Sequence, residues 1–261
     1  MNLCEVNSRL WQRFVTVPAF ILVLMGGTTH AFAQESNFKF TLGLKGWIND
    51  WETSNLFQGS ILSTTGNKIA AIPSATVSYK NFFVTGGYFI KNSYGFPDSS
   101  TVVNNGGVPT TVTLHQTADR KEGDLNVGWY FIPQVAVTLG YKDVRLNKTK
   151  SSTPGILVSH SEELKVHAAT FGIQGSARIG ESAFFLYGNR ASSLPNGAKA
   201  TAPGGSANGS FGSTEVGGGY QFSNNLSVTL GYKYQIIDLS VGGLRARDVT
   251  SGAILGANYT F

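Results

Sequence analysis

The chain has 261 residues, of which 41% are hydrophobic and 13% are charged, and 20 Lys and Arg against 15 Asp and Glu give a formal net charge of +5. Average proteins carry about 25% charged residues. The basic residues here are not clustered, which excludes the basic stripe of a nucleic-acid-binding protein. The mean hydropathy is −0.02, so apolar residues must be interleaved with uncharged polar ones. Together with 32 glycines and 12% aromatic residues, this composition favours a β-rich protein.

The beginning of the chain is typical of a cleaved signal peptide. Arg9 and Arg13 precede an apolar run over 14–25, which is shorter than the roughly 20 residues needed to span a bilayer. Ala31 and Ala33 supply the small-x-small pattern that precedes a cleavage site. We therefore expect export and cleavage after Ala33.

The sequence accordingly predicts two parts, a signal peptide over 1–33 and one mature domain over 34–261. The only cysteine, Cys4, lies in the first part. A disulfide framework in the mature domain is therefore excluded.

Alternating apolar and polar residues run through the mature domain. In the first segment Leu42 and Leu44 share one face, whereas Lys39 and Lys45 lie on the other, because successive strand side chains point to opposite faces. Ten such segments can each supply the roughly 9–11 residues of a tilted transmembrane strand. They lie near residues 37–49, 69–79, 82–92, 118–131, 135–146, 162–175, 183–190, 212–222, 226–238 and 249–261.

Short and long connections alternate between these segments, which is the asymmetry expected of membrane barrels. The long connections are rich in Gly, Ser, Thr, Asn and Pro and fall near 50–68, 93–117, 147–161, 191–211 and 239–248. The sequence thus predicts an all-β fold, an antiparallel up-and-down transmembrane β-barrel of about ten strands, with eight or twelve as alternatives.

Three places break the alternation. Pro73 lacks a backbone donor inside the second segment, so we expect a bulge or an early strand end there. In the sixth segment the apolar parity slips between Val166 and Phe171, which predicts a second bulge. The stretch 183–187 is apolar on both faces.

The last segment ends in an aromatic pattern. Leu255, Ala257, Tyr259 and Phe261 share one face. This resembles the C-terminal signature of Gram-negative outer-membrane β-barrel proteins, and the chain is similar in size and hairpin style to opacity-type surface proteins and small porins. The resemblance implies that Tyr259 and Phe261 belong to the signal read by the barrel-insertion machinery, and that the protein resides in the outer membrane of a Gram-negative bacterium among its lipids and lipopolysaccharide. The basic stretch 145–150 predicts a solvated loop, with contact with lipopolysaccharide as the alternative.

Two of the three histidines in the mature domain have polar neighbours. His160 precedes Ser161, but adjacent residues rarely place an imidazole and a hydroxyl in nucleophile–base geometry. His167 shares a strand face with Glu163 and Lys165, which predicts a lumen ion-pair network, with a proton relay as the alternative.

The third histidine, His115, lies in a Thr-rich segment without a carboxylate within a few residues. Asp119 and Asp124 follow it, which leaves an Asp/His protease-like site open. There is no His-x-x-x-His spacing and no cysteine pair, so we expect no metal and no cofactor. The glycines at 217–219 are expected to permit close packing.

The inward parity predicts a polar, slightly basic lumen. Its expected lining is Lys39, Lys45, Lys91, Arg120, Glu122, Asp124, Lys142, Glu163, Lys165, His167, Glu215 and Lys233. Buried charges must be paired or hydrated, so the lumen is either a narrow anion-preferring pore or a plug of ion pairs. The predicted function is a small porin-like channel or a non-catalytic surface barrel. The alternative is an outer-membrane enzyme that hydrolyses lipid or peptide, or an adhesin that acts through its long loops. The sequence leaves the oligomeric state open.

Overall fold

The computed structural model describes residues 38–54, 61–155, 160–202, 205–241 and 244–261. The expected signal peptide, including Ala31 and Ala33, lies outside the described residues. Twelve strands occur within the described ranges. They are β1 (Phe38–Ser54), β2 (Ile61–Ser63), β3 (Lys68–Tyr79), β4 (Phe82–Gly95), β5 (Ser99–Asn105), β6 (Val108–Ile132), β7 (Val135–Thr153), β8 (His160–Arg178), β9 (Phe184–Ala202), β10 (Gly205–Gln221), β11 (Leu226–Val241) and β12 (Leu244–Thr260).

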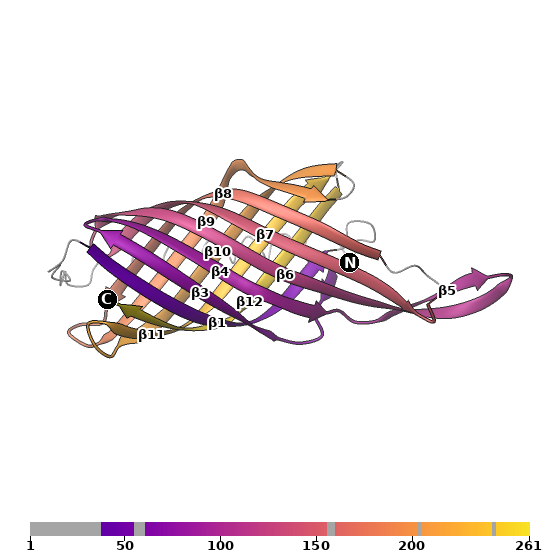
Figure 1. The fold of residues 1–261 in the computed structure, drawn as a ribbon, viewed down its shortest axis with the longest axis horizontal. Coiled ribbons are helices and arrows are strands. Elements are labelled where there is room, and N and C mark those ends of the chain that lie inside the picture. The colour runs from indigo at the N-terminus through magenta and orange to yellow at the C-terminus, as the bar shows by residue number, and fades with distance from the viewer. Residues whose placement is uncertain (1–37, 55–60, 156–159, 203–204, 242–243) are drawn as a thin grey trace, which may run out of the picture.

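Ten of these strands form a closed antiparallel ring (Figure 1). Consecutive ring strands are hydrogen-bonded neighbours, and β12 pairs with β1 to close the barrel. The short β2 pairs with the end of β1, and β5 forms a hairpin with β6 that projects beyond the ring. The predicted barrel of about ten antiparallel strands is therefore confirmed. None of the described residues belongs to a helix long and apolar enough to cross a membrane.

The ring strands are longer than the sequence pattern indicated. β6 has 25 residues and β7, β8 and β9 have 19 each, whereas a tilted strand needs only about 9–11 residues to cross a membrane. Much of the expected long connections over 93–117, 147–161, 191–211 and 239–248 is strand. The barrel therefore extends well beyond the height of a bilayer.

The two halves of the barrel have opposite apolar faces. One end carries the short turns and is called here the short-turn end; the other is the long-loop end. Toward the short-turn end the apolar side chains face outward, as with Leu44, Leu230 and Leu255, each more than half exposed. Toward the long-loop end they face inward. This inner cluster comprises Trp51, Tyr94, Phe96, Ala118, Val144, Leu146, Val166, Ala168, Ala198, Ala200, Ala207, Phe211, Ile237, Leu239 and Ala246.

This inversion explains the apparent slip in β8. Val166 is buried inside the barrel and Phe171 is half exposed outside, and the pairing of β7 with β8 runs without a register shift. The predicted bulge is therefore absent from β8. The register shift between β8 and β9 arises in β9, because one residue of β8 lies between the paired positions Ala168 and Thr170, whereas four residues of β9 lie between their partners Ala198 and Ser193.

The other two irregular places are accommodated locally. Pro73 pairs with Leu44 of β1, while the pairing of β3 with β4 begins only at Ser74. The proline thus lies where β3 has one paired neighbour, and the strand continues past it. At the start of β9, the inward Phe185 ring covers Gly219, where a Cβ atom would clash with it. The stretch 183–187 is therefore apolar on both faces because one face packs inside the barrel.

Candidate functional site

A network of buried charges lies in the middle of the lumen, centred on Glu122 of β6. Its Oε1 atom accepts a hydrogen bond from Arg120 Nε at 2.6 Å, and its Oε2 atom lies 2.6 Å from Lys142 Nζ of β7. Gln235 of β11 donates to Oε1 at 2.9 Å, and Arg120 also donates to the Thr250 hydroxyl of β12. Because β6 is not a neighbour of β11 or β12 in the ring, these last two bonds cross the lumen.

A second ion pair joins β1 to β10. Lys45 Nζ lies 2.7 Å from Glu215 Oε1, and the Glu215 side chain is almost fully buried. Lys233 Nζ lies 4.9 Å from the centre of the Trp47 ring, a cation–π contact. Because β1 and β10 are not neighbours in the ring, the ion pair between Lys45 and Glu215 is a second link across the lumen.

Aromatic side chains fill the lumen next to the network, toward the long-loop end. Trp51 is fully buried and meets Tyr94 and Phe96 edge-to-face at centroid distances of 5.4 and 5.5 Å. The Arg120 guanidinium lies 5.6 Å from the Trp51 ring centre. The Tyr94 hydroxyl donates to Asn49 Oδ1 at 2.7 Å. The ion pairs and this aromatic layer together occupy the lumen at mid-height.

The structure brings most of the expected lumen residues together and identifies others. The inward faces of their strands carry Lys39, Lys45, Arg120, Glu122, Asp124, Lys142, Glu215 and Lys233. Gln235 was expected on the inward face and lies there, whereas Trp51, Tyr94 and Asn49 were missed. Their position on the same strand parity as the lumen charges was the available signal.

Four expected lumen residues lie on the outer wall instead. Lys91 faces outward and pairs with Asp119 at 2.7 Å, because a register shift between Phe89 and Asn92 reverses the parity of β4. Glu163, Lys165 and His167 face outward because their part of β8 belongs to the half of the barrel in which apolar residues point inward.

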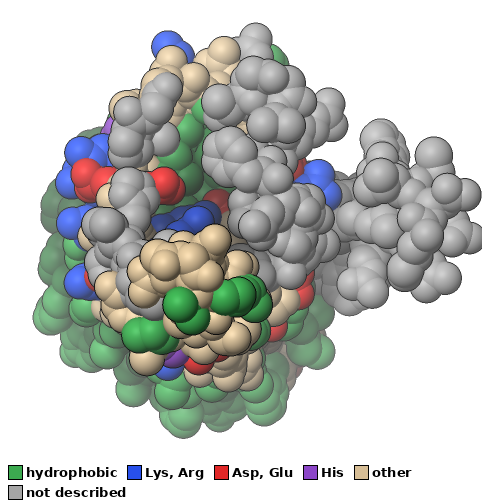
Figure 2. All heavy atoms as spheres, turned by 90° about the vertical axis from the view of Figure 1, so that its right-hand side faces the viewer, with side chains coloured by type: hydrophobic (Ala, Val, Ile, Leu, Met, Phe, Trp, Pro, Cys, Tyr) green, Lys and Arg blue, Asp and Glu red, His purple; other side chains and the backbone are tan. Residues whose placement is uncertain are grey.

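These outward charges pair on the wall of the long-loop half. Lys165 lies 3.2 Å from Glu163, and His167 Nδ1 lies 3.0 Å from Asp143 Oδ1 without hydrogen-bond geometry. The His167 ring stacks against Tyr141 with a centroid distance of 6.0 Å. Figure 2, which looks at the long-loop end, shows charged side chains around this end and hydrophobic ones covering the wall farther from the viewer.

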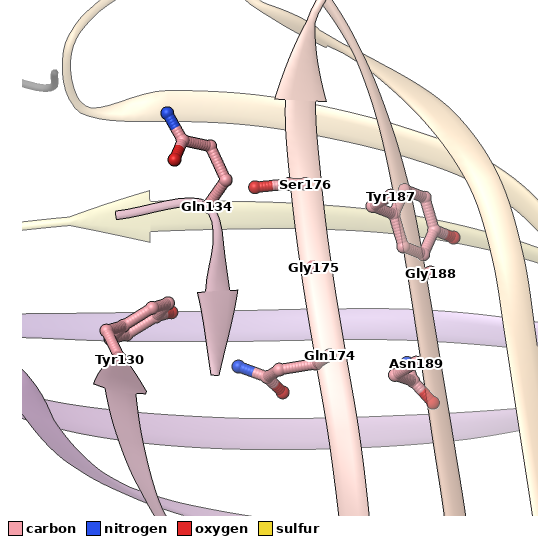
Figure 3. A pocket seen from close by; sticks show the side chains of 8 residues that line it. All are labelled: Tyr130, Gln134, Gln174, Gly175, Ser176, Tyr187, Gly188 and Asn189. Carbon is pink, nitrogen blue, oxygen red and sulfur yellow. The ribbon is translucent and has the colours of Figure 1, made fainter. Parts of the chain in front are cut away.

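A small polar pocket lies inside the barrel at the short-turn end (Figure 3). Its volume is about 190 Å³, and it is lined by Tyr130, Gln134, Gln174, Gly175, Ser176, Tyr187, Gly188 and Asn189. None of these side chains carries a charge at neutral pH. The lining of the pocket is therefore polar but uncharged.

The histidine of the Thr-rich segment has a carboxylate partner that sequence proximity did not indicate. His115 Nδ1 lies 2.9 Å from Asp98 Oδ1, and His115 Nε2 lies 3.1 Å from the Thr153 hydroxyl. Asp119 and Asp124 point elsewhere, Asp119 to Lys91 and Asp124 to Lys142. The side chain of His160 lies outside the described part of the structure. Within the described residues, no three His, Cys, Asp or Glu side chains are close enough to hold a metal ion.

Comparison with known proteins identifies the fold. No family model and no curated protein matches the sequence. Among solved structures, the outer membrane protease OmpT from Escherichia coli matches with a TM-score of 0.57 at 17% identity, over 89% of this chain and 99% of that one. Ail of Yersinia pestis matches with a TM-score of 0.40 at 10% identity (87% and 100% covered), and the toluene transporter TodX of Pseudomonas putida with 0.36 at 9% (86% and 90%). The chain has the fold of Gram-negative outer-membrane β-barrel proteins.

Proposed function

We propose that the protein is a closed surface barrel of the Gram-negative outer membrane that has no conducting pore and acts at its long-loop end. The barrel fold and the outward apolar band of the short-turn half support this location. Short turns of such barrels face the periplasm and long loops face the medium, so the long-loop half stands outside the cell.

The observation that carries the proposal is the occupied lumen. Glu122 holds two cations, Arg120 and Lys142, and all three side chains are nearly or fully buried. Breaking such a network is costly because it leaves uncompensated buried charge. About eight strands give a filled interior and 16–18 a channel, and in this ten-stranded ring Trp47 and Trp51 take up much of the remaining width.

The outer wall supports contact with the lipid headgroups. Lys121, Arg145 and Lys165 lie directly opposite one another on β6, β7 and β8 and form what we call the outer basic row. It lies beyond the outward Tyr141, where an aromatic belt would mark the membrane boundary. We also propose that the outer basic row contacts anionic lipopolysaccharide.

Planar-bilayer recording tests the closed lumen. The wild-type protein, refolded and shown by its faster migration on an unheated gel to be a barrel, is expected to give no conductance steps. The comparison variant is Arg120→Ala/Glu122→Ala/Lys142→Ala/Trp51→Ala, which removes Glu122 together with both of its cations and the ring beside them and is expected to pass current. Wild-type steps whose anion preference reverses in Lys142→Glu would show a pore and overturn the proposal.

A further inference from the structure

Three residues from separate segments meet at the base of the β5–β6 hairpin, which projects beyond the ring (Figure 1). Asp98 immediately precedes β5, His115 lies in β6, and Thr153 is the last residue of β7. The two imidazole nitrogens are both engaged: Nδ1 lies 2.9 Å from the Asp98 carboxylate, and Nε2 lies 3.1 Å from the Thr153 hydroxyl. A hydroxyl, a base and an orienting carboxylate in this order are the signature of an activated nucleophile.

We propose that Asp98, His115 and Thr153 form a hydrolytic site for unhindered carboxylic esters on the outer surface of the barrel. This activity goes beyond the closed-barrel function and does not depend on it. All three side chains are exposed to a considerable degree, so a substrate reaches them without any rearrangement of the barrel.

The chemistry follows from the two hydrogen bonds. With the Nδ1 proton donated to Asp98, Nε2 carries the lone pair and accepts the Thr153 proton. Thr153 Oγ1 then forms a bond to the ester carbonyl carbon, the bond to the leaving alkoxide breaks, and His115 gives that alkoxide the proton. Water, deprotonated by the same imidazole, releases the acid and restores the hydroxyl.

A donor for the developing oxyanion lies beside the nucleophile. Thr113 is the direct partner of Thr153 across the β6–β7 ladder, and it lies two residues before His115, on the same face of β6. Hydroxyl side chains act as oxyanion donors in other hydrolytic sites.

Because the carboxylate of Asp98 is exposed and its charge is screened by solvent, it acts mainly by fixing the orientation and tautomer of His115.

The second histidine–carboxylate pair provides a matched control. His167 lies 3.0 Å from Asp143, also on the outer surface of the long-loop half, but the second contact of its ring is Tyr141, which stacks on it. It has the imidazole and the carboxylate without an aligned nucleophile. Ester hydrolysis by a free surface imidazole would therefore occur at both histidines, whereas hydrolysis through Thr153 occurs only at the first.

The test uses the full mature barrel refolded in detergent micelles. Hydrolysis of p-nitrophenyl acetate is followed spectrophotometrically, and a fluorophosphonate, which transfers its phosphonyl group to an activated hydroxyl with loss of fluoride, is mapped by peptide mass spectrometry. We expect the phosphonyl group on Thr153. Thr153→Ala and His115→Gln should lower the rate about 100-fold, the lower end of the about 10²–10⁴-fold effect of a positioned base, whereas Thr153→Ser keeps activity and His167→Gln leaves it unchanged.

Two results would overturn the site. One is absence of label from Thr153 in wild-type protein that migrates as a folded barrel. The other is a Thr153→Ala variant that hydrolyses the ester as fast as wild type, which would mean that the imidazole acts alone. The bilayer experiment is independent of both outcomes, so failure of this site and failure of the closed-barrel proposal are distinguished.

Discussion

Replacing Glu122 by Gln should destabilise the barrel strongly. The change keeps the shape of the side chain but removes the negative charge that holds Arg120 and Lys142, whose side chains are 1% and 9% exposed. Loss of one partner from a buried ion pair costs about 3–5 kcal/mol because the remaining charge is left uncompensated. With a urea dependence of about 1–3 kcal/mol per molar, a loss of 3 kcal/mol moves the unfolding midpoint down by about 1–3 M.

Urea unfolding in detergent micelles, followed by tryptophan fluorescence and by gel mobility without heating, measures this shift. The matched control is Glu163→Gln, which breaks a 3.2 Å pair with Lys165 on the outer wall, where the two side chains are 51% and 41% exposed. Exposed pairs contribute about 0–1 kcal/mol, so the control midpoint should hardly move. Equal shifts for the two variants would refute the argument that the Glu122 charge is buried and structurally required.

Further predictions concern the wall, the lumen and the end of the chain. Leu230→Arg should impair assembly, because an outward Arg near the bilayer midplane costs about 2–4 kcal/mol; the folded fraction on unheated gels measures this. Thr229→Arg should also lower the folded fraction, since Thr229 is inward and buried, whereas an open, hydrated lumen would accommodate the change. Phe261→Asp should reduce the amount of assembled barrel in cells far more than its local energetic cost of about 0–1 kcal/mol would explain. Normal surface levels of this variant would contradict a role of Phe261 in insertion. Reversing the charges of the outer basic row should weaken binding to lipopolysaccharide vesicles, and wild-type binding should fall as salt rises and screens charges over about 10 Å at 0.1 M.

The sequence was informative wherever strand parity alone decides the answer. The closing strand is one example, because Leu255 and Tyr259 alternate with polar residues up to the end of the chain and do face outward. Arg120, Glu122 and Lys142 are another, because their segments run without a bulge through the middle of the barrel. In these places a period of two residues specifies which side chains point inward.

Parity could not show where the apolar face changes sides. Val166 and Phe171 differ in parity, and the sequence alone therefore predicts a bulge. In the structure the strand stays regular and the environment changes instead: apolar side chains face outward in the short-turn half and pack inside the barrel in the long-loop half. The same inversion explains why His167, which was expected in the lumen, faces the outer wall. The reversal of Lys91 has a different cause, since an extra residue in β4 opposite β6 leaves no mark in the polarity of the sequence.

The outer-surface triad was beyond sequence reasoning for a third reason. Asp98 and Thr153 lie 17 and 38 residues from His115, within segments that composition marked as loops, and only the pairing of Ser99 with Leu114 and of Thr113 with Thr153 brings them together. Contacts that depend on two registers cannot be read from local alternation. Sites made in this way are found only after the strand pairing is known.

The packed interior also determines where this barrel can work. Because the charge network and the aromatic layer occupy the lumen at mid-height, the closed-barrel proposal places the polar pocket at the short-turn end and the triad at the long-loop end in different compartments. A barrel that only anchored a loop would need strands of about 9–11 residues, yet the ring strands here continue through a second, inside-apolar half. Under the proposed hydrolytic function, this half serves to hold β6 and β7, whose pairing places His115 beside Thr153.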